Sequence, residues 1–214
     1  MPRPRALIFD LEEALLDRRQ AWQYAVEESV AAVCGERLSA RELVAEYRMR
    51  PWSHALSVLV VDRQKQPAVE EACVTMYERS AMKRLLVHEG MGMALDAVRA
   101  HHVEIGAISR EPHRIALKQI ESTGLDRFLT VLAPTPEREA WDVAARLREC
   151  TAFLEREPGD VTYVGCDSRD LEAAQRTGFG AAVAGYSGCD LEGHRIVRSP
   201  AELVGLLSGL RGGD

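Results

Sequence analysis

Short, mainly apolar segments recur along the chain, and each of them ends at a polar or small residue. Strands that a parallel sheet buries on both faces have this composition. Apolar residues at helical spacing fill most of the stretches between these segments. The alternation predicts an α/β fold, with a doubly wound parallel sheet and helices on both of its faces. The expected strands are residues 5–9, 103–108, 128–132, 161–164 and 181–184.

Residues that begin and end helices support this division. Residues Met91–Ala100 carry apolar side chains at helical spacing, and Pro112 and Gly124 are placed to begin and end the next helix. Thr135 and Ser168 are expected to begin the two helices that follow, because Thr and Ser side chains cap helix N-termini. Each gap between expected strands therefore contains a helix.

One long stretch, residues 18–86, interrupts the alternation and has a mainly helical pattern. Residues 39–42 (SARE) have the form of a capping box ahead of a helix. Residues 55–61 fit either a helix or a strand. The pattern predicts a small helical domain inserted after the first strand. The expected domains are a core of residues 1–17 and 87–214 and a helical insertion of residues 18–86.

Composition and charge narrow the class of protein. The chain has 214 residues, of which 46% are hydrophobic and 28% charged, as in ordinary globular proteins. Its net charge of −6 gives no general attraction to nucleic acid or to anionic membranes. No apolar run approaches the roughly 20 residues that cross a bilayer, and the first residues lack the features of a signal peptide. We therefore expect a cytoplasmic protein without nucleic-acid or membrane partners.

The cysteines and histidines show no metal-binding or disulfide pattern. The five cysteines are odd in number and widely spaced, and no two of them form a CxxC pair. This spacing argues against a disulfide framework and against a zinc site. The six histidines show no HExxH motif.

Polar side chains at the ends of the expected strands suggest a site. Asp10, Ser109 and Asp167 follow three of these strands, and Asp170 lies one turn into the next helix. In open parallel sheets, ligands bind beyond the carboxyl ends of the strands. Grouped carboxylates suit magnesium, and a hydroxyl beside helix N-termini suits phosphate. Taken alone, each of these residues is equally well explained as a helix cap or as an ordinary polar residue at a strand end. The prediction of a ligand site therefore rests on their joint placement.

Four segments, in order along nearly the whole chain, resemble the motifs of the haloacid dehalogenase (HAD) superfamily. Residues 8–17 (IFDLEEALLD) resemble the first motif, hhDxDGTLhD, and residues 105–109 (IGAIS) resemble the second, hhhhS/T. Residues 133–137 (APTPE) resemble the third, KPxPE. Residues 161–174 (VTYVGCDSRDLEAA) resemble the fourth, hhhhGDxxxDhEAA. The resemblance implies a Rossmann-like core, with the helical insertion acting as a cap that sets the substrate.

The resemblance also implies phosphoryl transfer through an aspartyl-phosphate. Asp10 would be the nucleophile, which splits one difficult step into two easier ones. Glu12 stands where the family's phosphatases have their general acid and base. Magnesium would be held by Asp10 and Asp170, with Asp167 taking the part of the motif's other aspartate, whose own position is one residue earlier.

Phosphate binding is expected from Ser109 and Arg110. The resemblance gives the phosphate to the hydroxyl of Ser109. Arg110 follows directly, and a guanidinium there is able to clamp phosphate with two parallel hydrogen bonds. The alternative is that Arg110 is a solvated loop charge.

Three departures from the motifs bear on activity. Glu12 is one methylene longer than the usual aspartate, Ala133 replaces the third-motif lysine, and Cys166 replaces a magnesium-binding aspartate. A thiol is a poor magnesium ligand. We therefore expect a phosphatase for a small phosphorylated metabolite whose activity is weak or lost. The alternative is a catalytically inactive HAD-like protein that binds a ligand or a partner protein. A dehalogenase is a third reading, since its chemistry needs the aspartate and no magnesium, but it also uses the missing lysine.

Overall fold

The computed structural model describes residues 3–41, 52–60 and 62–208. The chain divides into two compact units, and the helical segment between Arg18 and Leu86 separates from the rest. The first unit consists of Met1–Asp17 and Val87–Asp214. The helix expected after residues 39–42 lies outside the described residues. No helix in the described part of the chain is long and apolar enough to cross a membrane.

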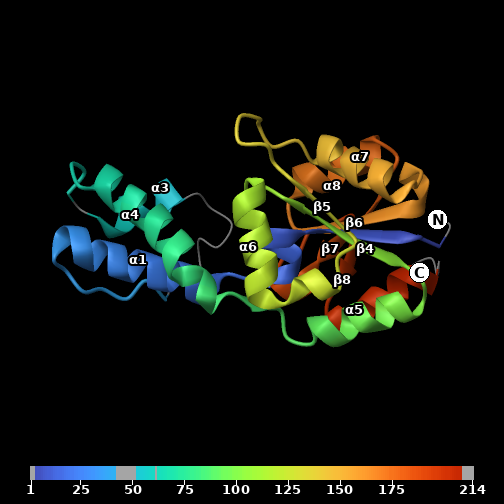
Figure 1. The fold of residues 1–214 in the computed structure, drawn as a ribbon, viewed down its shortest axis with the longest axis horizontal. Helices are drawn as coiled ribbons and strands as arrows, with labels where there is room; N and C mark the ends of the chain where they lie inside the picture. Colours follow the sequence, from blue (N-terminus) through green and yellow to red (C-terminus); the bar gives the residue numbers. More distant parts are fainter. Residues whose placement is uncertain (1–2, 42–51, 61, 209–214) are drawn as a thin grey trace. The chain divides into compact units, whose positions relative to one another are not determined.

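A parallel sheet of six strands forms the centre of the first unit, in the order β5-β4-β1-β6-β7-β8 (Figure 1). Every neighbouring pair is parallel, which confirms the predicted fold class. Strand β8 was not predicted, because it is short and begins with a charged residue. The strands are β1 (Ala6–Asp10), β4 (Glu104–Ser109), β5 (Val131–Pro134), β6 (Val161–Gly165), β7 (Gly180–Ala184) and β8 (Arg195–Val197).

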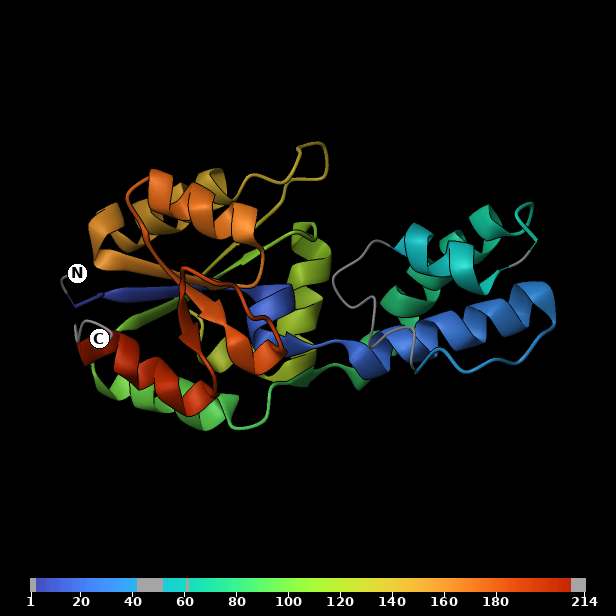
Figure 2. The ribbon, with the colours of Figure 1, turned by 180° about the vertical axis from the view of Figure 1, so that it is seen from behind.

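Helices cover both faces of this sheet (Figures 1 and 2). The central strand β1 shows why its sequence is apolar throughout: Leu7 and Phe9 pack into one core cluster, and Ile8 packs into the cluster on the opposite face. Because successive side chains of a strand point to opposite faces, both sets are buried. The helices are α5 (Met91–Ala100) and α6 (His113–Thr123) on one face, with a 3-10 helix (Pro200–Ser208), and α7 (Val143–Leu154) and α8 (Ser168–Arg176) on the other.

Two predicted helix starts are wrong, and both errors concern the site. The helix expected to begin at Thr135 is α7, which begins only after Asp142, whose side chain caps it. Thr135 instead follows directly after strand β5. Helix α8 is capped by Asp167 rather than by Ser168. An aspartate is as good a cap as a serine. Gly124 ends α6 as predicted, with a positive φ of 69°.

The second unit, Arg18–Leu86, is helical and has a hydrophobic cluster of its own. Residues 55–61, which fitted either structure, belong to a helix as far as Leu59. Helix α1 ends where Gly35 adopts a left-handed conformation, with a φ of 74°. The helices are α1 (Arg19–Cys34), α3 (Trp52–Leu59) and α4 (Gln66–Arg79), with a 3-10 helix (Ala81–Arg84). Strands β2 (Leu16–Asp17) and β3 (Leu86–Val87) pair where the chain leaves and re-enters the first unit.

Candidate active site

The structure brings the predicted site residues to one edge of the sheet. Asp10 is the last residue of β1, and Ser109 is the last residue of the neighbouring strand β4. Asp167 follows β6, which pairs with β1 on its other side. Asp170 lies in the first turn of α8. Parallel strands direct their carboxyl ends to the same edge, so four residues far apart in the sequence meet there.

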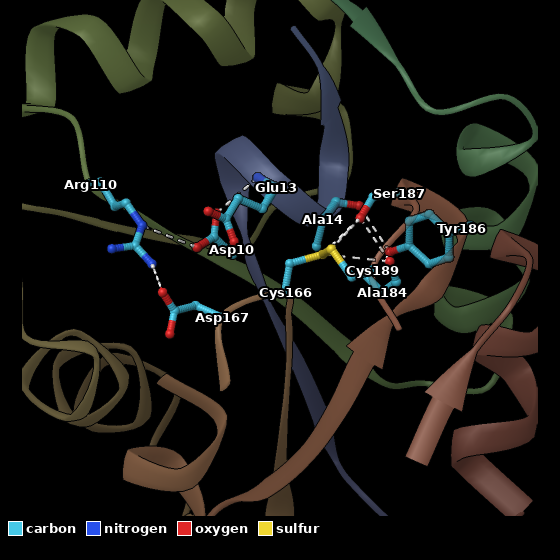
Figure 3. Close-up of a disulfide and its surroundings, with 10 residues drawn as sticks. All are labelled: Asp10, Glu13, Ala14, Arg110, Cys166, Asp167, Ala184, Tyr186, Ser187 and Cys189. Atoms are coloured by element: carbon cyan, nitrogen blue, oxygen red, sulfur yellow. Dashed lines mark hydrogen bonds and ion pairs between the residues drawn. A yellow bond between two sulfur atoms is a disulfide. The ribbon is translucent and has the colours of Figure 1, made fainter. Parts of the chain in front are cut away.

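Asp10 is fixed by the turn that follows it. Residues Leu11–Leu15 form one turn of π-helix, a rare element that is frequent at functional sites. The N–H of Glu13 donates to Oδ1 of Asp10 at 2.9 Å, and the Asp10 side chain has no exposed surface. One carboxylate oxygen is therefore used in orientation, and the other faces Arg110 (Figure 3).

The side chain of Glu12 accepts hydrogen bonds from two residues at the end of strand β4. The hydroxyl of Ser109 donates to Oε1 of Glu12 at 2.5 Å, and the backbone N–H of Arg110 donates to Oε2 at 3.1 Å. The Glu12 side chain is buried. Hydrogen bonds to an ionised acceptor are about twice as strong as neutral ones. The Ser109 hydroxyl, which was expected to bind a phosphate, thus donates to a carboxyl group of the chain itself.

Arg110 is surrounded by carboxylates. Its guanidinium lies 2.5 Å from Oδ2 of Asp170, 3.8 Å from Oδ2 of Asp10 and 4.0 Å from Oδ2 of Asp167, the last two drawn in Figure 3. Burial lowers the pKa of Arg110, but the charges of Asp10, Asp170 and Glu13 outweigh it and raise the pKa above its ordinary value. The reading of Arg110 as a solvated loop charge is therefore wrong.

Trp141 completes this network, and the sequence did not reveal its role. Its indole N–H lies 3.2 and 3.0 Å from the two carboxylate oxygens of Asp170, and the guanidinium carbon of Arg110 lies 4.5 Å from the ring centre. Burial raises the pKa of Asp170, while Arg110 and the indole N–H oppose the rise. The sequence pattern places Trp141 inside a helix, but helix α7 begins only at Val143. The pattern therefore gives no sign that Trp141 lies at the site.

Tyr163 lies on strand β6 and has no exposed surface. Its hydroxyl has no hydrogen-bond partner among the described residues. A side chain at Gly165 would come within 2.5 Å of that hydroxyl, which explains the glycine. Burial raises the pKa of Tyr163 well above its ordinary value, and the charges of Asp10 and Asp170 raise it further. The hydroxyl therefore keeps its proton.

The third motif contributes a buried alanine and a threonine that contacts the end of strand β4. Ala133 has no exposed surface and packs in the cluster of helices α7 and α8. Thr135 lies beside the site instead, and both its N–H and its hydroxyl lie 2.9 Å from the carbonyl oxygen of Ser109. Ala133, at the position of the motif's lysine, therefore supplies no cation, and the side chain next to the end of β4 is that of Thr135.

The donor set does not fit magnesium. One oxygen of Asp167 caps helix α8 through the N–H groups of Arg169 and Asp170, at 2.8 and 3.4 Å. Asp170 and Asp10 face Arg110. Within residues 3–41, 52–60 and 62–208, no group of three Asp, Glu, His or Cys side chains is placed to hold a metal ion. The three predicted ligands are near one another but engaged with protein donors.

The expected absence of disulfides is wrong for one pair. Cys166 and Cys189 form a disulfide with an S–S distance of 2.15 Å and Cα atoms 5.7 Å apart (Figure 3). The partners are 23 residues apart, and the parallel pairing of β6 with β7 brings the segments that follow these strands together. The odd cysteine count concealed the pair because three other cysteines, Cys34, Cys73 and Cys150, are free.

Thiol counting tests the disulfide. Without reductant, alkylation of the unfolded protein is expected to modify three cysteines, and after reduction all five. Burial raises the pKa of Cys73 to about 11 and that of Cys150 to about 12, so both should react only after unfolding. Reduction should lower the free energy of unfolding by about 3 kcal/mol, because the bond constrains the unfolded chain. The stability of a Cys189→Ser variant should not respond to reductant, and five modified cysteines without reductant would contradict the bond.

Comparison with known proteins agrees with this architecture. The chain matches the model of haloacid dehalogenase-like hydrolases over residues 7–184. An HAD-superfamily hydrolase of subfamily IA from Geobacter sulfurreducens PCA has a TM-score of 0.80 at 15% identity, over 96% of this chain and 97% of that one. A candidate phosphatase from Clostridium difficile has a TM-score of 0.82 at 14% identity, over 97% and 100%. A candidate β-phosphoglucomutase from Thermotoga maritima has a TM-score of 0.74 at 16% identity, over 97% and 100%.

No curated protein matches the chain at a significant level. At 14–16% identity these three solved structures establish the fold alone. The family model, however, covers the greater part of the chain and includes Asp10, Ser109, Asp167 and Asp170. The chain belongs to the haloacid dehalogenase-like hydrolase family.

Proposed function

We propose that this protein is a phosphatase-type member of the family that acts on a small phosphorylated metabolite through Asp10, with turnover strongly reduced by its own side chains. The buried Asp10, oriented by the π-helical turn and next to the Ser109 strand, supports the reaction type. The helical unit Arg18–Leu86 is assigned to substrate selection, as the resemblance implies. The proposal includes a cytoplasmic location, which fractionation of the source cells would test.

The reaction consists of two displacements. An Asp10 carboxylate oxygen bonds to phosphorus as the bond to the leaving alcohol oxygen breaks, and the alcohol takes a proton from the acid. A water oxygen then bonds to the phosphorus of the aspartyl-phosphate as the bond between phosphorus and the Asp10 oxygen breaks; the water gives a proton to the same acid-base residue, the Asp10 carboxylate is restored, and inorganic phosphate leaves. Glu12 occupies the sequence position for both proton transfers.

The proposal of reduced turnover rests on the hydrogen bonds that Glu12 accepts. Its two carboxylate oxygens accept hydrogen bonds from the Ser109 hydroxyl and the Arg110 N–H. A phosphate group must displace a buried carboxylate to use these donors, and it also meets the negative charges of the site. A misplacement of about 1 Å alone can lower a rate about 10²-fold. Glu12 thus competes with a phosphate group for the Ser109 hydroxyl and the Arg110 N–H, and these bonds hold it back from proton transfer in the proposed reaction.

The same contact favours a second candidate function, a non-catalytic ligand-binding or protein-interaction module. In that case the hydrogen bonds from Ser109 and Arg110 to Glu12 would stabilise the folded state, and no reaction would take place at Asp10. The two functions differ in one observable property, which is turnover that depends on Asp10.

A phosphatase panel separates the two candidates. Release of inorganic phosphate from p-nitrophenyl phosphate and small sugar phosphates should be slow, well below the ~1–10³ per second typical of enzymes. Asp10→Asn should abolish it, whereas Asp126→Asn, at an exposed position in a 3-10 helix, should leave it unchanged. Equal rates in wild type and Asp10→Asn would favour the binding module. Chloride release from a haloacid in the same panel would favour the dehalogenase instead.

A further inference from the structure

Three carboxylates from three different segments converge on one guanidinium. Asp10 comes from strand β1, Asp167 from the end of β6 and Asp170 from helix α8, and each lies within 4.0 Å of Arg110. Asp10 has no exposed surface and Asp170 is 7% exposed. Buried charges need a counter-charge, because a low-dielectric surrounding stabilises them poorly. A cation at this point is therefore a structural requirement of the site.

Arg110 is built into this position. Its backbone N–H donates to Glu12, its guanidinium donates to Asp170, and the ring of Trp141 lies against the guanidinium. Only a third of its side-chain surface is exposed. An arginine held at its backbone, by its charge and by an aromatic ring loses little further freedom in this position.

We propose that Arg110 is the resident cation of the site: its guanidinium, in place of a divalent metal, neutralises Asp10, Asp167 and Asp170. The inference rests on the proposed function only in placing the chemistry at Asp10. Two consequences follow. The folded protein is indifferent to magnesium, and removal of the Arg110 side chain creates a magnesium site.

Charge and space account for both consequences. Magnesium prefers about six oxygen ligands at 2.0–2.1 Å and keeps several waters, for which the guanidinium leaves no room. Arg110 also repels a divalent ion at close range. Without its side chain, three carboxylates repel one another around a water-filled space. Hard oxygen ligands and excess negative charge are what magnesium requires.

Calorimetric titration with magnesium chloride tests the inference on the full chain. The wild type should give no binding heat, and magnesium should not shift its melting temperature. In Arg110→Ala, affinity for magnesium should increase by about 100-fold or more, because a positive charge about 4 Å away has been removed. Arg110→Lys, which keeps the charge, should stay close to wild type. The control is Arg176→Ala, which removes an exposed arginine paired with Glu172 on helix α8 and should also resemble wild type.

Two results would overturn the inference. One is tight magnesium binding by the wild type. The other is a folded Arg110→Ala protein, with wild-type circular dichroism, that gains no magnesium affinity. If Arg110→Ala does not fold, the inference is still tested by titrating the wild type and Arg110→Lys with magnesium, because tight binding by either protein would contradict it. The proposed function fails separately: a protein without Asp10-dependent turnover contradicts the function, whereas magnesium binding by the wild type contradicts the role of Arg110.

Discussion

A variant that combines Glu12→Asp, Arg110→Ala, Thr135→Lys and Cys166→Asp is expected to hydrolyse p-nitrophenyl phosphate at least about 10³-fold faster than the wild type when magnesium is present. General acid-base catalysis alone typically contributes about 10²–10⁴-fold, and stabilisation of developing charge is often larger. The measurement is release of p-nitrophenol at saturating substrate, with and without magnesium.

Each change removes one obstacle that the structure shows. A shorter side chain at position 12 no longer spans both the Ser109 hydroxyl and the Arg110 N–H, so both donors become available to phosphate. Arg110→Ala vacates the cation position. Thr135→Lys places an amine beside the Ser109 carbonyl, at the edge of the sheet. Cys166→Asp supplies the missing carboxylate.

Controls assign the gain to the site. Asp10→Asn in the combined variant should abolish activity. Each single change should have little effect, because catalytic groups that act as one unit are strongly non-additive. Since Cys166→Asp also opens the disulfide, Cys189→Ser alone serves as its control. A combined variant that folds, binds magnesium and remains inactive would show that Asp10 itself is misplaced, and the binding-module reading would then be preferred.

The architecture could be predicted because its causes are local. Residues 6–9 (ALIF) are apolar on both faces, as a central parallel strand must be, and they form most of β1. Gly124 ends a helix because glycine tolerates a positive φ, whatever surrounds it. Strand β8, Arg195–Val197, shows the limit of this reasoning, because edge strands need little apolar surface.

The sequence predicts which residues lie at the strand ends that form the site, but it does not predict the side-chain contacts between them. Asp10 and Ser109 meet because neighbouring parallel strands end together. The bonding of Glu12, the contact of Trp141 with Arg110 and the pairing of Cys166 with Cys189 depend on three-dimensional distances between distant segments. No periodicity in the sequence records such distances.

At the third motif, the sequence does not indicate which side chain reaches the edge of the sheet. Side-chain direction along a strand repeats every two residues, so Ala133 and Thr135 are equivalent in pattern, and the end of a strand is uncertain by a few residues. The structure buries Ala133 inside β5, whereas Thr135 follows the last residue of that strand and bonds to the Ser109 carbonyl. A lysine substituted at each position tests which of the two accommodates a cation.

Ala133→Lys is expected to lower the melting temperature by about 10 °C or more, whereas Thr135→Lys should cost only a few degrees. Ala133 packs against an apolar cluster that includes Ile8 and Leu147 and has no exposed surface, so a charged amine there would be buried without a partner. Burial of an unpaired charge belongs to the few mechanisms that cost about 4 kcal/mol or more. Thr135 is also buried, at 8% exposed, but it follows the last residue of β5, so the flexible lysine stem is expected to carry the amine to solvent and the variant mainly loses one hydrogen bond, worth about 1 kcal/mol.

The pH dependence identifies charge as the cause of the loss. Burial depresses the pKa of a lysine amine in the folded state, so the unfolded state binds more protons between that pKa and the unfolded value of about 10.4. Stability then rises with pH across this interval. The deficit of Ala133→Lys relative to wild type should therefore shrink between pH 7 and pH 10. Ala133→Met, which adds similar bulk without charge, should show a deficit that does not change with pH. A pH-independent deficit in Ala133→Lys would mean that overpacking causes the loss, or that the amine reaches solvent at the edge of the sheet.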